Sequence, residues 1–412
     1  MSYQEKYLKY KNKYLILKNQ LGGIVCSQCH RDSAQDLIDG KCVQCNTSVH
    51  TANRAVKLFS SVDLGFGSAA RDNLTQREAM TVGSTNKQMN MAVREHWEKK
   101  SIAREFISSI GSEGNALGQF NEPDGMCSAI DSSGNPLLLV CDSLNGRTVV
   151  VNPSDSRCIR TLQNPVDTAQ VTSAVAFLPR TGQVLVLEDE YVVVFAGVND
   201  STVVRTIGRG RGRGLGQLNF PRGLAVLDGG IADAAAPEGP IAVVADTKNH
   251  RLSLFRVRDG TFMQDVGSQG SAPGQFLNPA AVVVVPAGTM GNTETLLVVT
   301  DSGNRRVQVL TRTGEVVRIL QGNADISLGN QLYGVAVCIS TGEVLVTDHL
   351  NHRVLSWQLS DGSGLSVVCG GVEGAGPGEF SSPSGLVAFD DGSLWVAEEG
   401  NHRLSFLTDR KW

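Results

Sequence analysis

The sequence lacks the long apolar runs that cross membranes and the residue biases of fibrous or unstructured chains. No run of about 18 apolar residues occurs in the 412-residue chain, which argues against a membrane-spanning helix. The lysine-rich N-terminus is not followed by an apolar segment, so we expect no signal peptide and an intracellular, cytoplasmic protein. Proline accounts for 13 residues, and no Gly-X-Y period accompanies the 45 glycines, which excludes collagen and bulk disorder.

Common catalytic motifs are also missing. The sequence has no HExxH string, no phosphate-binding lysine loop and no Ser-His-Asp or Cys-His order typical of nucleophilic enzymes. We therefore favour a non-enzymatic function.

Charge is unevenly distributed along the chain. Residues 1–103 carry 15 Lys and Arg against 9 Asp and Glu, whereas residues 104–412 carry 22 against 32. Phosphate affinity comes mainly from clustered Lys and Arg, so the acidic larger part argues against non-specific nucleic-acid binding. The chain thus combines a basic N-terminal region with an acidic body.

An acid-x-x-Asn-x-Arg pattern recurs five times in the acidic body. Each copy lies between two short apolar runs, which predicts a tight turn between two strands. Asp and Asn suit such turns because their short side chains bond nearby backbone amides. The repeated residues, which we interpret as structural, are Asp142, Asn145, Arg147, Asp246, Asn249, Arg251, Asp301, Asn304, Arg306, Asp348, Asn351, Arg353, Glu398, Asn401 and Arg403.

A second motif precedes most copies, and a sixth copy is degenerate. Glycine-rich stretches end in Gly-Gln-Phe or a variant, and a Pro-x-Gly follows at 123–125, 221–223 and 383–385. The gap between Asp142 and Asp246 is about two repeats wide. It holds three apolar runs, at 171–177, 184–188 and 191–195, which predict the strands of a further copy. Six four-stranded blades are therefore expected.

The last copy ends without an outer strand of its own. Residues 105–110 form a strand candidate that belongs to no earlier blade. We predict that this segment closes the ring as the fourth strand of the final blade, because closure removes an open sheet edge.

The two linked motifs resemble the NHL repeat over roughly residues 104–412. The resemblance implies an all-β, six-bladed NHL-type β-propeller that binds a protein partner. Some NHL-type propellers are amidating lyases that use metal-bound histidines, but no matching ligand set is found here. Proteins of the tripartite-motif NHL group join a RING and other zinc modules to the propeller, and this chain looks like a reduced version. A ubiquitin-ligase component or adaptor is therefore the alternative function.

Arginines and histidines supply a candidate ligand face. Arginine pairs bidentately with phosphate, so the loop at 209–213 is either an anion- or RNA-contacting patch or an ordinary solvated loop. Histidines on the repeat turns either bind a metal or hold structural places in the repeat. The candidates are Arg209, Arg211, Arg213, Arg222, His250, His349, His352 and His402.

Four cysteines near the N-terminus have metal-site spacing. Cys26, Cys29, Cys42 and Cys45 form two C-x-x-C pairs, and four thiolates suit tetrahedral zinc. We predict one zinc per chain in a knuckle at residues 24–50, with His30 and His50 as spare ligands. The other five cysteines are scattered and are expected to be buried thiols in a reducing compartment.

Residues 1–23 and 51–103 flank the predicted knuckle. Apolar residues from Tyr3 to Leu21 follow a heptad spacing, which predicts an amphipathic helix that offers self-association. This lysine- and tyrosine-rich opening resembles those of many proteins of mimivirus-like giant DNA viruses, which implies host cytoplasm or virion. Residues 51–103 are polar, and we interpret them as a linker with a helix at 86–100.

Overall fold

The computed structural model describes residues 37–38, 41–42, 104–163, 171–227, 239–289 and 292–409. The chain divides into two compact units, residues 1–100 with residue 412 and residues 101–411. In the first unit, β1 (Leu37–Ile38) pairs antiparallel with β2 (Lys41–Cys42). The predicted helices and linker lie outside the described residues. So do three of the four predicted zinc ligands, Cys26, Cys29 and Cys45, whereas Cys42 ends β2.

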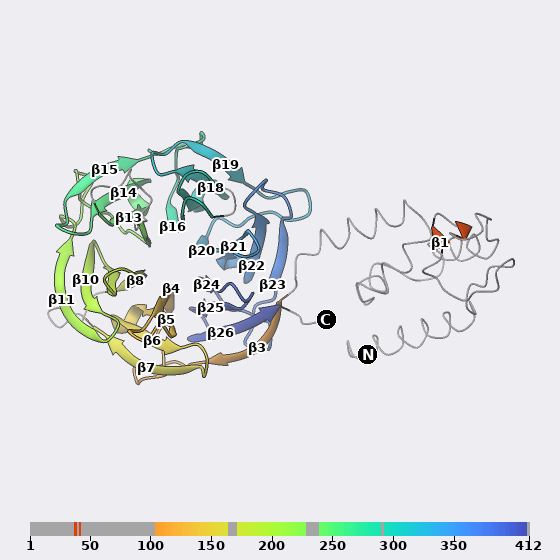
Figure 1. Ribbon diagram of the computed structural model, residues 1–412, viewed down its shortest axis with the longest axis horizontal. Coiled ribbons are helices and arrows are strands. Elements are labelled where there is room, and N and C mark those ends of the chain that lie inside the picture. The colour runs from red at the N-terminus through yellow and green to blue at the C-terminus, as the bar shows by residue number, and fades with distance from the viewer. Residues whose placement is uncertain are drawn as a thin grey trace. The chain divides into compact units, whose positions relative to one another are not determined.

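The second unit is a ring of four-stranded antiparallel sheets, each one a blade (Figure 1). Blade 1 contains β4 (Pro123–Ile130), β5 (Pro136–Asp142), β6 (Arg147–Asn152) and β7 (Arg157–Leu162). Blade 2 contains β8 (Thr172–Leu178), β9 (Gln183–Glu188), β10 (Tyr191–Gly197) and β11 (Asp200–Ile207). Blade 3 contains β12 (Gly223–Leu227), β13 (Ile241–Asp246), β14 (Arg251–Arg256) and β15 (Phe262–Val266).

The remaining blades complete the ring. Blade 4 contains β16 (Pro279–Val285), β17 (Leu296–Asp301), β18 (Arg306–Thr311) and β19 (Val316–Leu320). Blade 5 contains β20 (Leu332–Cys338), β21 (Glu343–Asp348), β22 (Arg353–Gln358) and β23 (Ser366–Gly370). Blade 6 contains β24 (Pro383–Ala388), β25 (Leu394–Glu398), β26 (Arg403–Asp409) and β3 (Arg104–Ile110). The predicted six four-stranded blades are confirmed, including the degenerate copy, which is blade 2.

The hydrophobic core lies between neighbouring blades. Each of six buried clusters joins two adjacent blades; one of them packs Leu185 and Leu187 of blade 2 against Ala242 and Val244 of blade 3. A middle strand such as β13 is therefore covered on both faces and buried along its whole length, which explains its continuous apolar sequence. Among the scattered cysteines, Cys141 and Cys338 are buried as predicted, whereas Cys127, Cys158 and Cys369 are partly exposed.

The ring is closed by the first propeller strand. β3 pairs antiparallel with β26, with Ile110 opposite Leu404 and Ser108 opposite Phe406. The predicted closure is confirmed, and the observed strand begins one residue earlier, at Arg104. Closure of this kind leaves blade 6 with the same four strands as the others.

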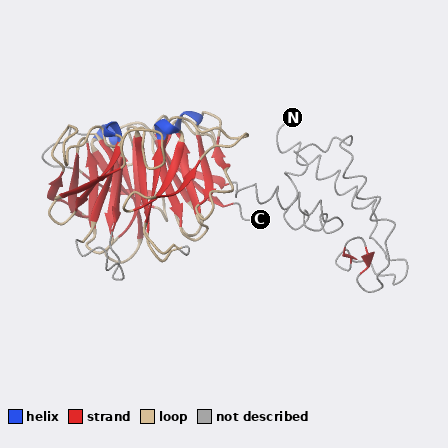
Figure 2. Ribbon diagram, turned by 90° about the horizontal axis from the view of Figure 1, so that it is seen from above, coloured by secondary structure: helices blue, strands red, loops and turns tan. Residues whose placement is uncertain are grey.

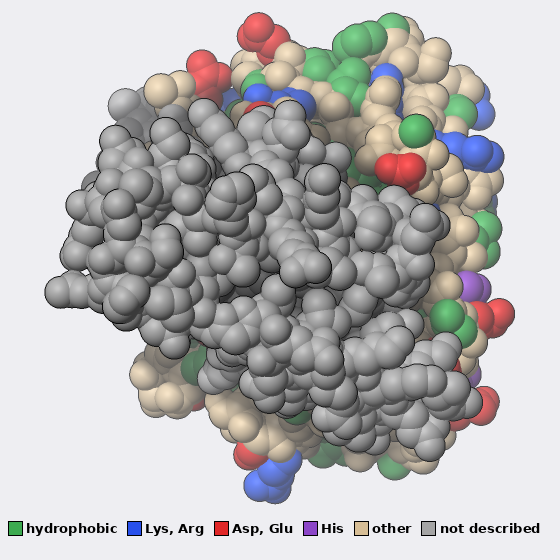
Figure 3. All heavy atoms as spheres, turned by 90° about the vertical axis from the view of Figure 1, so that its right-hand side faces the viewer, with side chains coloured by type: hydrophobic (Ala, Val, Ile, Leu, Met, Phe, Trp, Pro, Cys, Tyr) green, Lys and Arg blue, Asp and Glu red, His purple; other side chains and the backbone are tan. Residues whose placement is uncertain are grey.

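The edge of the ring that carries the repeat turns is called the turn face. One-turn 3-10 segments lie there between the second and third strands of four blades (Figure 2). They are η3 (Ser143–Asn145), η4 (Thr247–Asn249), η5 (Ser302–Asn304) and η6 (His349–Asn351). The outermost strands form an outer wall. On the part of this wall that is visible in Figure 3, charged and apolar side chains are interspersed.

Candidate functional site

The repeat residues Asp142, Asn145 and Arg147 form one hydrogen-bonded unit. Asp142 is fully buried, and its Oδ2 accepts from Arg147 Nε at 2.7 Å and from Asn145 Nδ2 at 2.9 Å. Arg147 also donates to the backbone carbonyls of Ala116 and Gln119 in the glycine-rich loop, both at 3.0 Å. The turn and the glycine-rich loop are therefore held together by charge-assisted bonds, which explains why the two motifs occur together in the sequence.

The same acid–arginine pair recurs in four other blades. The distances from the arginine Nε to the carboxylate are 2.9 Å for Arg251 and Asp246, 2.7 Å for Arg306 and Asp301, 2.9 Å for Arg353 and Asp348, and 2.7 Å for Arg403 and Glu398. In each of these blades the asparagine side chain also donates to the acid, from Asn249, Asn304, Asn351 and Asn401. These hydrogen bonds therefore hold the turns of the turn face in a fixed conformation.

Three of the candidate histidines accept backbone hydrogen bonds from the next blade. The Nδ1 atoms of His250, His352 and His402 accept from the amides of Asn278, Ser382 and Glu122 at 3.0, 3.1 and 3.2 Å. Each of these histidines therefore links its blade to the next one. Among the described residues, no group of three His, Cys, Asp or Glu side chains is arranged to hold a metal.

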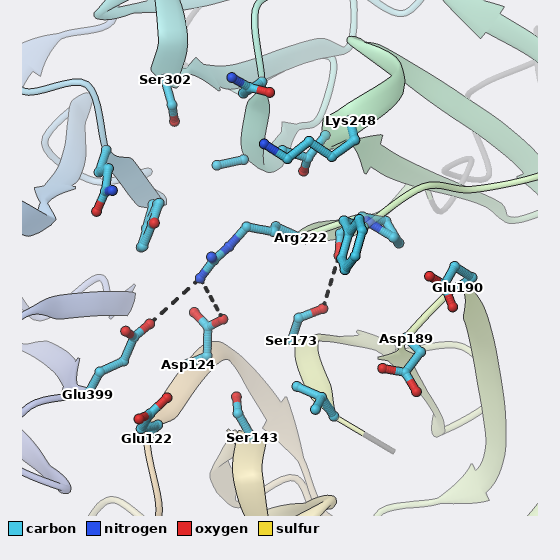
Figure 4. A pocket seen from close by; sticks show the side chains of 18 of the residues that line it. Glu122, Asp124, Ser143, Ser173, Asp189, Glu190, Arg222, Lys248, Ser302 and Glu399 are labelled. Atoms are coloured by element: carbon cyan, nitrogen blue, oxygen red, sulfur yellow. Dashed lines mark hydrogen bonds and ion pairs between the residues drawn. The ribbon is translucent and has the colours of Figure 1, made fainter. Parts of the chain in front are cut away.

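A cavity of about 670 Å³ opens on the turn face at the centre of the ring. Every blade contributes to its lining, through Asp124, Ser173, Arg222, Ala280, Tyr333 and Glu399 in chain order. Figure 4 shows Asp124, Arg222 and Glu399 converging from different blades on its floor. A concave site with converging polar groups is the usual form of a binding site.

The Pro-x-Gly motif places its middle residue on this floor in blades 1 and 3. A Cβ at Gly125 would lie 2.5 Å from the carbonyl oxygen of Ser173 in the next blade, and one at Gly385 would lie 2.2 Å from that of Asp124. Glycine is therefore required because the innermost strands touch backbone to backbone around the axis. The residue before the glycine, Asp124 in blade 1 and Arg222 in blade 3, lines the cavity.

Arg222 connects four blades across the floor. Its guanidinium lies 3.1 Å from Asp124 and 3.7 Å from Glu399, and its central carbon lies 3.9 Å from the centroid of the Tyr333 ring. Tyr333 in turn packs against His349, with 4.5 Å between the two ring centroids. The ion pairs and the cation–π contact hold the Arg222 side chain in one place.

The carboxyl groups of the floor favour a bound proton. The pKa of Glu399 is raised to about 8, mainly by burial and also by the negative charge of Asp124, while Arg222 offsets part of the effect. Burial also raises the pKa of Asp124. His349 behaves in the opposite way, since burial lowers its pKa to about 4 and keeps the ring neutral. The floor therefore combines one fixed positive charge with carboxyl groups that resist ionisation.

Blade 2 contributes acidic residues to the wall of the cavity. Its second and third strands are joined through Asp189 and Glu190 instead of a 3-10 segment, and both residues line the cavity. Arg211 lies 3.6 Å from Glu190 and 4.0 Å from the centroid of the Phe220 ring. Of the predicted arginines, Arg222 lines the cavity and Arg211 packs against its wall, whereas Arg209 and Arg213 are exposed on the loop.

Sequence patterns did not identify Glu122, Asp124, Tyr333 and Glu399 as site residues. Asp124 occupies the variable position of the Pro-x-Gly motif, and Glu399 follows the repeat acid Glu398. These residues could have been found in the sequence by comparing the repeat copies, because the positions nearest the ring axis carry different residue types in different blades. Glu122 and Phe220 line the cavity at positive φ, 53° and 46°, and the equivalent Asn278 and Ser382 share this conformation, so it belongs to the repeat. Bulky residues seldom adopt that conformation.

One segment of the propeller matches a known repeat. Residues 380–405, which include β24, β25 and the turn of blade 6, match the NHL repeat. This match and the six blades support an NHL-repeat propeller.

A solved structure shares the propeller fold. It is a structural genomics protein of unknown function from Bacteroides thetaiotaomicron, 18% identical, with a TM-score of 0.53 over 74% of this chain and 76% of that chain. No curated protein sequence matches the chain. Within the part of the chain that the structure describes, no helix is long and apolar enough to cross a membrane.

Proposed function

We propose that the propeller is a non-enzymatic scaffold that binds a protein partner through the turn face. The supporting observation is a group of exposed apolar side chains on the loops and turns of this face. Leu215 is 67% exposed and Phe220 is 53% exposed, and both lie in the loop that enters blade 3. The others are Leu117, Leu144, Leu350 and Val372. Exposed apolar groups beside a cavity are typical of interaction sites.

The turn face is also firmly held, which favours binding. The acid–asparagine–arginine units fix its turns to the glycine-rich loops, so that little order has to be gained when a partner binds. The outer wall differs, because its exposed apolar residues, such as Ile159, Val204 and Val317, lie one to an outer strand.

Other blades of the same chain show which substitutions the fold tolerates at these positions. The η4 position equivalent to Leu144 and Leu350 is Lys248, and the blade 4 position equivalent to Phe220 is Asn278. A face variant with Leu144→Lys, Leu350→Lys and Phe220→Asn should therefore fold normally. A wall variant with Ile159→Thr, Val204→Thr and Val317→Thr serves as the matched control.

Quantitative affinity capture from cell lysate with the full chain tests the proposal. We expect proteins retained by wild type and by the wall variant to be lost from the face variant. A set of retained proteins that the face variant keeps and the wall variant loses would contradict binding through the turn face.

Two alternatives are separated by further assays. A ubiquitin-ligase role rests on the predicted zinc module, and ubiquitin chains formed by the purified protein with a conjugating enzyme would overturn the non-enzymatic proposal. RNA binding rests on Arg209, Arg211 and Arg213. Arg211 already lies close to Glu190 and Phe220, which weighs against it. Nuclease treatment of the lysate before capture tests it, since a retained partner that disappears would be RNA-linked.

A further inference from the structure

The cavity of the turn face has an excess of acidic side chains. Glu122, Asp124, Asp189, Glu190 and Glu399 line it, against the two cationic side chains Arg222 and Lys248. Arg222 lies beside Asp124 and Glu399, which are partly buried, whereas Glu122 and Asp189 are exposed nearer to solvent. The exposed carboxylates at the opening therefore attract a positive group that enters, and the carboxyl groups of the floor lie further along its path.

Apolar groups stand beside this charge. Leu144, Phe220 and Pro221 also line the cavity, and the first two are more than half exposed. A volume of about 670 Å³ lies in the range of sites that take a drug-sized ligand or a few residues of a peptide. The described residues hold no metal-binding group, so a metal cation is not the occupant that this geometry favours.

We propose that the cavity receives a lysine or arginine side chain of the protein partner, whose neighbouring residues pack on Leu144 and Phe220. This inference rests on the proposed function and specifies the partner's chemistry. The cationic group lies among Glu122, Asp189 and Glu399, while Arg222 stays on Tyr333 and beside Asp124. Complementary charge sets the register of the partner, and the apolar contacts supply the remaining affinity.

The protonation of the floor supports this occupant. Glu399 has a raised pKa because it is buried beside Asp124. A partner cation reverses that effect, since a nearby positive charge favours the ionised carboxylate. Binding of a cationic side chain therefore displaces the proton of Glu399. An anionic partner would instead be repelled by the carboxylates of the cavity.

A matched set of short peptides provides the probe. A fluorescein-labelled Leu-Gly-Arg-Gly-Leu peptide is titrated with the full chain and followed by fluorescence anisotropy. A second peptide carries citrulline in place of arginine, which keeps the shape and removes the charge, and a third carries glutamate. We expect the arginine peptide to bind about tenfold or more tightly than the citrulline peptide, which corresponds to about 1.4 kcal/mol.

Protein variants locate the interaction. Glu122→Gln with Asp189→Asn removes two charges at exposed positions, and we expect it to weaken binding of the arginine peptide about tenfold and to leave the citrulline peptide unchanged. Glu105→Gln with Glu315→Gln removes the same charge from exposed positions outside the cavity lining and should leave both affinities unchanged. Equal thermal melting of the two variants confirms that both are folded.

Several results would overturn the inference. They are equal affinity for the arginine and citrulline peptides, no binding of either peptide up to about 1 mM, equal losses in the two variants, and tighter binding of the glutamate peptide or of a single-stranded RNA. If capture of partners still depends on Leu144, Leu350 and Phe220, such a result removes the cationic occupant and leaves the proposed function standing. Failure of the capture experiment removes the proposed function itself.

Discussion

Arg104, the first residue of β3, donates to Oε2 of Glu343 in blade 5 at 3.1 Å, and both side chains are almost inaccessible to solvent. The same guanidinium donates through Nε to the carbonyl oxygen of Gly392 in blade 6 at 3.2 Å. Arg104 thus ties the strand that closes the ring to two blades at once.

Loss of Arg104 should destabilise the propeller strongly. Arg104→Met leaves the Glu343 carboxylate buried without its partner, and we expect a loss of about 3–5 kcal/mol in the free energy of unfolding. The double variant Arg104→Met with Glu343→Met should recover most of that loss, because no buried charge remains. Urea unfolding measures both, and a double variant as unstable as the single one would contradict this account.

Truncation tests closure directly. Deleting residues 1–103 keeps β3, so the remaining chain should be soluble and melt cooperatively. Deleting residues 1–111 removes the partner of β26 and exposes an apolar edge that includes Leu404 and Leu407, which invites aggregation. Equal melting temperature and solubility of the two fragments, measured by calorimetry and light scattering, would show that pairing of β3 with β26 does not hold the ring.

The fold was predictable because its repeat residues make the same contacts in every blade except blade 2. Asp142, Asn145 and Arg147 form contacts that recur in four other blades, so comparing copies reveals them. The floor of the cavity was not predictable in this way. Asp124, Arg222 and Tyr333 occupy equivalent innermost positions but differ in type, and they meet because the ring brings blades 1, 3 and 5 together on its axis.

The buried ion pairs of the repeat units should stabilise the propeller more than ion pairs at the surface do. Arg306 and Asp301 are almost inaccessible, so Arg306→Gln should cost about 3–5 kcal/mol in urea unfolding, since it leaves Asp301 buried without its cation. Arg258→Gln is the matched control, because Arg258 pairs with Asp259 at the surface. We expect the control to unfold like wild type. A similar loss in both variants would contradict a role for burial.

The predicted zinc site should be independent of the propeller. Cys26→Ser or Cys42→Ser is expected to abolish binding of the one zinc per chain and to leave the melting of the propeller unchanged, because both residues lie outside the repeats. Cys158→Ser changes a free thiol of β7 and should keep the zinc. Elemental analysis of protein purified under reducing conditions measures the metal, and wild-type protein without zinc would refute the prediction.

Glu399 should make the stability of the propeller fall as the pH rises towards 8. Its pKa is about 8 in the folded protein and near 4.5 when exposed, so the folded state binds more protons between these values, and stability falls across this range with no further loss above it. Asp124, Glu122, Arg222 and His349 face this carboxyl group. The pKa of His349 falls from 6.5 to about 4, so this ring gives the opposite slope below pH 6.5 and none above it.

The window from pH 6.5 to 8 therefore excludes the opposing contribution of His349. In that window we expect the melting temperature of wild type to fall relative to Glu399→Gln, which has no proton to lose, whereas Glu105→Gln, a change of the same kind on an exposed outer strand, should follow wild type. Differential scanning calorimetry at several pH values measures the difference. Parallel curves for wild type and Glu399→Gln would show that this carboxyl group ionises in the folded protein as it does in the unfolded chain.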